Sequence, residues 1–299
     1  RNIYMKDKTN IAENKVMIVG KLLDTSFASG KTKTGVPYER VRMMIRVSQT
    51  FGGREETSDI PVSMFAAQFK KDGGTNPGFE NIQTLKKMKT SQSYGYENAD
   101  TIRIGSGNIE ENVYVSQGRI VDGWQLRTSF VGFGKGPQAA TFSVEMFIMK
   151  MIEEVDREGE TTGRLIIKGA IPQWGSRLDV IDFIVENPES VDYISRNWEE
   201  GNTVHAVGRI RFTTKEESTS METGSWGEDI PQTSTRTIHE LIITKGSDEG
   251  YEEDEAYDPV EIRKGYNARK ADRDQKLLEA KEPKTTVKKA SLSFDDEDF

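Results

Sequence analysis

Basic and aromatic side chains alternate with apolar ones along a short segment near the start of the chain. Tyr38, Arg40 and Arg42 occupy every second position, and Val41 and Met43 occupy positions of the opposite face. A period of two predicts a β-strand with one buried face and one face open to solvent. Guanidinium groups bind phosphates and aromatic rings stack on bases, so this outer face has the chemistry of a nucleic-acid-binding surface.

Further cations and rings extend this candidate surface. In the first half of the chain they are Lys31, Lys33, Arg46, Phe51, Arg54 and Phe65. The second half contributes a thinner set, Trp174, Arg177, Arg209 and Arg211. For Phe65 the alternative interpretation is a place in the hydrophobic core. Several arginines on one strand would destabilise the fold unless their face is in contact with solvent or an anion.

The residues needed for most catalytic or metal sites are missing from the sequence. It has no cysteine and two histidines, His205 and His239, each within an apparent strand and each expected to face solvent. Asp179 and Asp182 lie three apart on a predicted strand and so face opposite sides, which does not suit a shared metal ion. There is no phosphate-binding loop or nucleophile motif. We therefore expect a protein that is not an enzyme, with no cofactor and no metal.

The 299-residue chain has a formal net charge of −8, and this charge is unevenly distributed. The last 54 residues carry 16 acidic and 10 basic side chains, which leaves 33 acidic and 31 basic ones in the first 245. A nearly neutral body does not suit a highly cationic duplex-binding protein, but it allows a local basic groove. No segment is long and apolar enough to span a membrane, and we expect a soluble, cytoplasmic protein.

The patterning predicts an all-β protein built from two similar halves. The first half has strands expected at 15–24, 38–47, 57–65, 112–121 and 124–133, with a helix at 79–89 and a hairpin turn at Asp122-Gly123. The second has strands expected at 140–155, 164–172, 178–185, 203–213 and 234–245, with a helix starting at Pro188. Gly20, Gly169 and Gly208 each interrupt an apolar strand, which is typical of tightly coiled barrels.

Five short strands and one short helix per half predict two oligonucleotide-binding (OB) folds, which are five-stranded Greek-key barrels. We expect the first at residues 1–135 and the second at 136–246, with a β-sandwich as the alternative fold. Residues 247–299 are expected to form a flexible linker and an acidic tip. A helix at 259–282 would have an apolar stripe too thin to bury much surface, so this segment is interpreted as linker.

The chain ends in Phe294, Asp295, Asp296, Glu297, Asp298 and Phe299. Four consecutive carboxylates between two phenylalanines suit docking into a basic pocket on a partner protein. The alternative is a solubilising tail, but the flanking rings add nothing to solubility.

Three segments and the tip resemble bacterial-type single-stranded DNA-binding proteins. Residues 14–47, with Asn14, Gly20 and the strand ending at Val47, are similar to the opening of that family, and residues 57–66 and 200–210 resemble its third strand and the strand after its helix. The tip is similar to the acidic tails of that family and of its phage relatives.

The resemblance implies binding of single-stranded DNA without sequence preference, in DNA replication, recombination or repair. It also implies recruitment of a polymerase, helicase or primase through the tip. The two halves, the missing Pro-Phe ending and the absence of a Gly/Gln-rich linker point toward a phage-encoded member acting in a bacterial host. An RNA-binding protein and a β-barrel structural or virion protein remain the alternatives.

Overall fold

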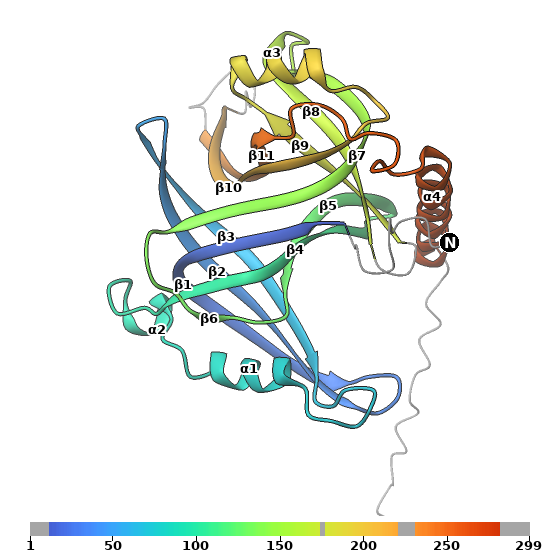
Figure 1. Cartoon of the computed structure of the whole chain (residues 1–299). Helices are drawn as coiled ribbons and strands as arrows, with labels where there is room; N and C mark the ends of the chain where they lie inside the picture. The colour runs from blue at the N-terminus through green and yellow to red at the C-terminus, as the bar shows by residue number, and fades with distance from the viewer. Residues whose placement is uncertain (1–11, 174–176, 221–230, 282–299) are drawn as a thin grey trace, which may run out of the picture.

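The structure, a computed structural model, describes residues 12–173, 177–220 and 231–281, and its strands form two barrels (Figure 1). The first barrel is made of β1 (Asn14–Lys31), β2 (Pro37–Phe51), β3 (Arg54–Ala67), β4 (Thr101–Ser116) and β5 (Arg119–Thr128). β1 pairs with β2 and β4, β3 pairs with β2 and β5, and β4 pairs with β5, so the sheet closes on itself. Within this first barrel the β3–β5 pairing is parallel and the other pairings are antiparallel.

The second barrel repeats this order with β7 (Ala139–Val155), β8 (Thr161–Pro172), β9 (Leu178–Val185), β10 (Thr203–Ser220) and β11 (Pro231–Gly246). Its parallel pairing joins β9 to β11, the third strand to the fifth. In each barrel a helical segment separates the third strand from the fourth, which is the arrangement of the OB fold. The prediction of two OB folds is confirmed, and the β-sandwich alternative is wrong because both sheets close.

The helices cover the barrels much as the sequence predicts. In the first barrel α1 (Pro77–Leu85) begins after Asn76, whose side chain accepts a hydrogen bond from the Gly78 amide, and it buries Ile82 and Leu85. A four-residue helix, α2 (Ser91–Tyr94), follows it, so this barrel has two helices where one was predicted. In the second barrel α3 (Pro188–Asn197) begins after Asn187, which caps it in the same way.

The core is built from the inward-facing positions of the strands. Val41, Met43, Ile45 and Val47 of β2 are all 0% exposed, which confirms the predicted alternation. Their neighbours Arg40 and Arg42 are exposed on the outer face. The alternation therefore places the basic residues of β2 outside the first barrel.

Each of the three strand glycines lies where neighbouring atoms leave no space for a side chain. A Cβ atom at Gly20 would meet the Arg46 carbonyl oxygen, and one at Gly208 would meet the Ile242 carbonyl oxygen and the Phe142 ring. At Gly169 it would meet the Met146 sulfur. Glycine is therefore needed at these three positions because there is no space for a side chain, whereas the link to tight coiling stays a prediction.

The hairpin in the first barrel turns at a different place from the one predicted. β4 and β5 are joined at Gln117-Gly118, whose φ angles of 50° and 73° suit a tight turn between antiparallel strands. Asp122 and Gly123 lie inside β5, paired with Val113 and Asn112. The Asp-Gly prediction was wrong because the two strands pair for three more residues beyond Asp122, so the pairing overrides the local turn preference.

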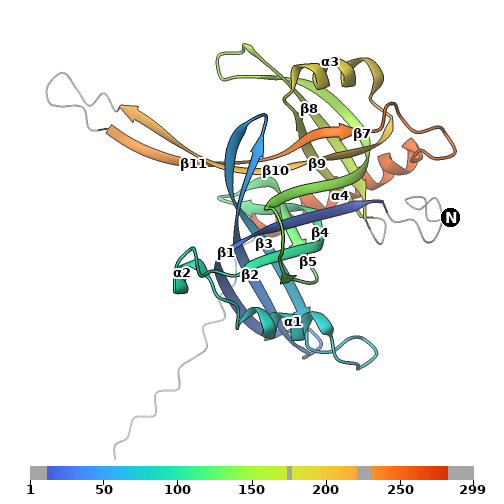
Figure 2. The same ribbon diagram turned by 60° about the vertical axis from the view of Figure 1, so that its left-hand side comes forward.

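The interpretation of residues 259–281 as linker is also wrong. They form α4 (Pro259–Lys281), which packs against β4, β5 and β9 beside the second barrel (Figures 1 and 2). Ile262, 2% exposed, anchors its first turns in the core. Ion pairs from Arg269 and Arg273 to Glu111 and Asp122 hold its middle. Ion pairs therefore hold α4 against the barrels, in place of the wide apolar stripe from which a packed helix is usually predicted.

The two barrels share one sheet and one core. β1 pairs antiparallel with β7 from Asn14 opposite Val144 to Val19 opposite Ala139, and the buried cluster continues through both barrels. A short strand, β6 (Gly132–Phe133), pairs with β4 in the connection between them. The domain limits at 135 and 246 stay predictions. Beyond the second barrel β10 and β11 continue as a two-stranded arm (Figure 2).

Candidate functional site

A groove of about 890 Å³ runs between the outer face of the first barrel and the base of the β10–β11 arm. β2, β3 and β5 form one wall, and β10 and β11 form the other. Its lining includes Arg40, Arg42, Met44, Asp59, Phe65, Trp124, Arg127, Phe212 and His239. We call it the basic groove.

Three arginines give this groove its charge. Arg40 and Arg42 project from β2 and are exposed, and neither has an ion pair with another residue in the part of the chain that the structure describes. Arg127 of β5 is 45% exposed and lies 3.1 Å from Glu110. The remaining acid of the groove, Asp59, accepts two hydrogen bonds from Arg46, at 2.7 and 2.6 Å. Arg40 and Arg42 therefore offer positive charge that no carboxylate among the described residues neutralises, whereas Arg127 is paired with Glu110.

Aromatic rings lie at both ends of the groove. At one end Phe65 of β3 is 46% exposed and packs on Tyr38, with ring centroids 5.1 Å apart. At the other end Trp124 of β5 lies 5.4 Å from the Phe212 ring and 5.2 Å from the His239 ring. Phe212 and His239 are stacked, with centroids 5.6 Å apart. We call Trp124, Phe212 and His239 the ring cluster.

His239 remains solvent-exposed on one side, but burial against its neighbours lowers its pKa although Glu240 acts in the opposite direction. Its ring is therefore neutral at pH 7. A neutral imidazole can stack on a base as the other rings do.

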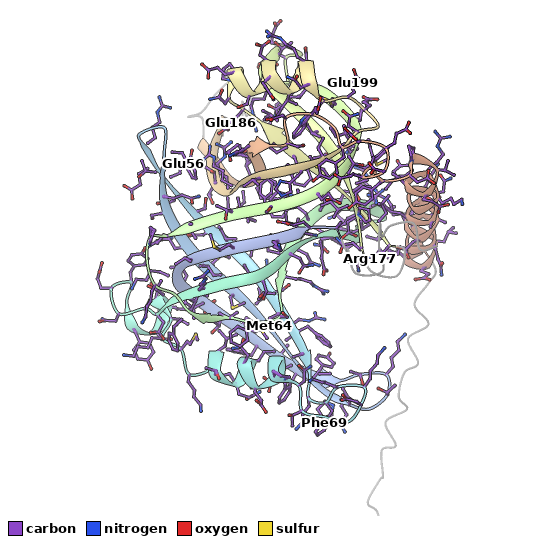
Figure 3. All side chains as sticks on the ribbon, viewed as in Figure 1. Glu56, Met64, Phe69, Arg177, Glu186 and Glu199 are labelled. Carbon is purple, nitrogen blue, oxygen red and sulfur yellow. The ribbon has the colours of Figure 1, made fainter. Side chains whose placement is uncertain are left out.

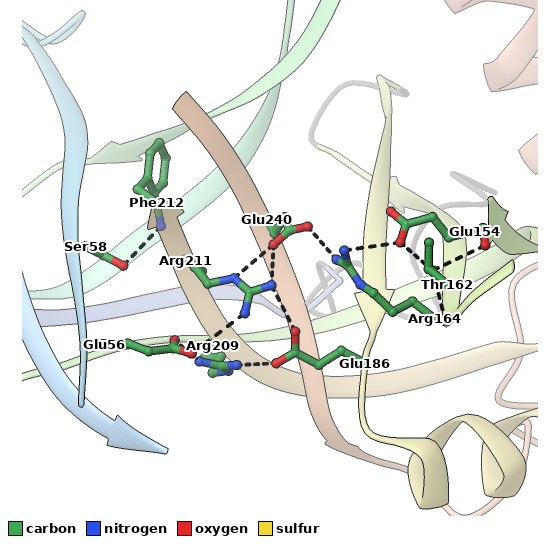
Figure 4. Close-up of polar contacts among 10 residues, drawn as sticks. All are labelled: Glu56, Ser58, Glu154, Thr162, Arg164, Glu186, Arg209, Arg211, Phe212 and Glu240. Atoms are coloured by element: carbon green, nitrogen blue, oxygen red, sulfur yellow. Dashed lines mark hydrogen bonds and ion pairs between the residues drawn. The ribbon is translucent and has the colours of Figure 1, made fainter. Parts of the chain in front are cut away.

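Arg209 and Arg211, predicted to bind DNA, lie outside the basic groove in a cluster of ion pairs (Figure 4). The Arg209 guanidinium is 7% exposed, between Glu56 of β3 and Glu186, and stacks over the Phe51 ring at 4.3 Å. Arg211 pairs with Glu186 and Glu240, and Glu240 also pairs with Arg164. Hydrogen bonds from both arginines hold the pKa of Glu240 below its usual range, although burial alone would raise it. The cluster joins the two barrels and leaves these cations neutralised.

The other predicted residues are dispersed. Lys31 and Lys33 are exposed at the loop between β1 and β2, and Arg54 is exposed at the tip of the β2–β3 hairpin. Arg177 pairs with Asp179 at 3.4 Å and lies near α4, apart from Met64 in the groove wall (Figure 3). Trp174 and the tip residues 294–299 lie outside the described residues. The structure thus gathers Tyr38, Arg40, Arg42 and Phe65, with Arg46 beside them.

A family model described as YorF matches residues 12–282. The chain belongs to the YorF family. No curated protein matches it. Among solved structures it is similar to a deletion mutant of the single-stranded DNA binding protein from Thermus aquaticus, at 12% identity and a TM-score of 0.48, covering 81% of this chain and 97% of that one. The wild-type Thermus aquaticus protein gives 12% identity, a TM-score of 0.45 and coverage of 80% and 93%. The fold of this YorF-family chain is assigned from its own strand pairings.

Sequence reasoning did not place Trp124, Arg127 or His239 in the candidate site of this YorF-family protein. Trp124 and Arg127 lie on β5, close to the misplaced hairpin turn, so their faces could not be assigned. His239 was predicted to be exposed, which is correct, but not to join an aromatic cluster. Phe212 lies directly opposite it in the β10–β11 pairing. If that register had been known, the contact between the Phe212 and His239 rings could have been predicted.

No group of three acidic or histidine side chains within the described residues is arranged to hold a metal ion. Across the same residues, no helix has the length and apolar character needed to cross a membrane.

Proposed function

We propose that this protein binds single-stranded DNA in the basic groove without sequence preference. Backbone phosphates would contact Arg40, Arg42 and Arg127, and bases would stack on Phe65 and on the ring cluster. The OB fold supplies a concave outer face for such a strand. Stacking and phosphate contacts are common to all bases, so this chemistry does not discriminate among sequences.

One observation carries the proposal. Arg40 and Arg42, which have no ion pair within the described residues, the half-exposed Arg127 and aromatic rings from both barrels line the same groove, although they come from β2, β3, β5, β10 and β11. An elongated groove that is basic and aromatic along its length fits a flexible strand better than a duplex, whose bases are stacked inside.

The test is a fluorescence anisotropy titration of labelled oligo(dT) at two salt concentrations. Matching duplex DNA and oligo(U) serve as competitors. Release of counterions predicts that affinity falls as salt rises, with a slope of about 0.7 per phosphate contact on a single strand. Preference for oligo(U) would indicate an RNA-binding protein instead. Absence of binding to every probe would favour the structural-protein alternative.

Arginine substitutions locate the site. Arg40→Ala and Arg42→Ala should each weaken binding and lower the salt slope by about 0.7 to 1. Arg196→Ala is the matched control, because Arg196 is 72% exposed on α3, away from the groove. Equal loss of affinity in all three variants would place the strand elsewhere.

We further propose that the tip recruits replication or recombination proteins of a bacterial host to phage DNA. The support is the sequence of residues 294–299, with four carboxylates between two phenylalanines. Purified polymerase, helicase or primase should bind the full chain but not a chain lacking these residues. If both chains recruit such partners equally, the tip is a solubilising tail.

A further inference from the structure

A second groove, of about 670 Å³, lies between α4 and the outer face of β8 and β9. Trp124 and His239 line this groove as well as the basic groove. The two grooves therefore meet at the ring cluster. In the second barrel β8 and β9 take the places of β2 and β3, so the second groove crosses the matching face of that barrel.

The charges of the second groove cancel. Arg269 pairs with Glu111, Arg273 with Asp122, and Lys168 with Asp182. Glu240 is held by Arg164 and Arg211, as described above. Of the remaining lining residues that the structure describes, Lys270 and Asp274 carry one charge of each sign. We call this the neutral groove, in contrast to the basic groove.

The neutral groove has apolar and aromatic surface for a ligand. Ile120 of β5, Val180 and Ile184 of β9 and Tyr266 of α4 line it. The Tyr266 ring is 36% exposed and lies 5.9 Å from the Arg269 guanidinium, which ties the ring to the anchored part of α4. The rings of Trp124 and Tyr266 thus share the lining with aliphatic side chains and with the paired charges.

We infer that the neutral groove binds bases of the same DNA strand that lies in the basic groove, while contributing no phosphate contacts. This inference rests on the proposed function. A strand leaving the basic groove over Trp124 and His239 would enter the neutral groove directly. Its paired charges give it no net attraction for phosphate, whereas its rings and aliphatic side chains suit base faces.

If the basic groove contacts phosphates and the neutral groove contacts only bases, the two grooves should affect the salt dependence of binding differently. Phosphate contacts set the salt dependence of binding, and stacking on rings does not. An oligonucleotide long enough to enter the neutral groove should bind more tightly than a short one, with the same salt slope. If the second groove bound phosphates instead, the slope would increase with length.

The experiment compares oligo(dT) of about 8 and about 16 nucleotides, lengths that bracket one OB-fold site, at several salt concentrations. Tyr266→Ala should lower the affinity for the longer oligonucleotide about tenfold and leave the shorter one and both salt slopes unchanged. Tyr266→Phe, which keeps the ring, should restore the affinity. Tyr193→Ala on α3 is the matched control, since Tyr193 is 46% exposed and lies outside both grooves.

A second variant keeps the test valid if Tyr266→Ala loosens α4. Ile120→Ala alters β5 rather than α4, and it should weaken binding of the longer oligonucleotide alone. Unchanged binding of both lengths in Tyr266→Ala and Ile120→Ala, or a steeper salt slope for the longer one, would overturn the inference while leaving the basic groove intact. Failure of both lengths to bind the unmodified protein would instead overturn the proposed function.

Discussion

At the scale of single residues, burial distinguishes the aromatic rings that are available for binding from those that stabilise the core. Phe142 and Phe183 are fully buried and pack on each other, with centroids 5.5 Å apart. Phe65 is 46% exposed although it lies on β3 between buried Met64 and Ala66. An exposed ring beside Arg40 and Arg42 costs the fold little when it is removed, so its effect on binding can be measured cleanly.

We predict that Phe65→Ala weakens binding of oligo(dT) by about 1 to 3 kcal/mol, the loss of one stacking platform. Phe133→Ala is the matched control, because Phe133 is 63% exposed on β6 and does not line the groove. Anisotropy titrations of both variants at one salt concentration measure the difference, and thermal melts check that both are folded. Equal affinities for the two variants would remove Phe65 from the site.

Asp179 is a buried carboxyl that the proposed binding does not use. It is 3% exposed on β9 and accepts a long hydrogen bond of 3.3 Å from the Glu111 amide. Burial raises its pKa to about 6, although Arg177 acts in the opposite direction. Compared with the unfolded chain, the folded chain therefore favours the protonated form of Asp179. Its contribution to stability is present at low pH and is lost as pH rises through about 6.

We therefore predict that Asp179→Asn stabilises the protein more at about pH 7.5 than at about pH 4.5, because the loss begins above the free value of 3.8 and is complete above about 6. The difference between the two pH values should be about 1 to 3 kcal/mol, since the pKa lies about two units above the value of 3.8 for a free aspartate. Urea unfolding of both proteins at the two pH values measures it. A variant that shifts stability equally at both would show that Asp179 does not titrate in this range.

At the scale of elements, the sequence predicts the strands that have one buried face. It does not predict elements whose position is set by contacts with residues distant in the sequence. The alternation of β2 and the start of α3 at Pro188 are local signals, and both were predicted correctly. The Gln117-Gly118 turn and α4 were missed, because the turn is set by the pairing of β4 with β5 and α4 by ion pairs to Glu111 and Asp122. For the same reason Arg40 and Phe65 could be proposed as site residues from the sequence, whereas Phe212 and His239 needed the register of a strand pair.

The glycines within the strands give a prediction at this scale. Gly208→Ala should destabilise the fold by about 1 to 3 kcal/mol or more, since its Cβ would overlap the Ile242 carbonyl oxygen and the Phe142 ring. Gly105→Ala on β4 is the control, because its Cβ would meet only an arginine side chain, at 3.8 Å. Urea unfolding compares them. Similar stability of the two variants would show that the barrel can relax around an extra methyl group.

At the scale of the whole molecule, the basic groove exists because two barrels are held in a fixed arrangement. Its two walls belong to different barrels, so any change in their arrangement would separate Trp124 from Phe212 and His239. The β1–β7 pairing and the shared core hold the two barrels together. The ion pairs around Arg209 supply a second contact, far from β1 in sequence and between Glu56 of the first barrel and Glu186 of the second.

Arg209→Ala should therefore weaken both stability and DNA binding, although Arg209 does not line the basic groove. Its removal leaves Glu56 and Glu186 with Arg211 as their remaining cation, at 3.8 and 2.9 Å. We expect a cost of about 2 to 4 kcal/mol, below that of a fully buried pair because Glu56 and Glu186 are 31% and 28% exposed. Unfolding should remain a single transition, since β1 and β7 stay paired. Glu56→Gln should cost less, because Arg209 keeps Glu186. Urea unfolding and oligo(dT) titration measure the two effects, with Arg196→Ala as the exposed control. A full loss of DNA binding with unchanged stability would mean that Arg209 contacts the strand itself, as the sequence first suggested.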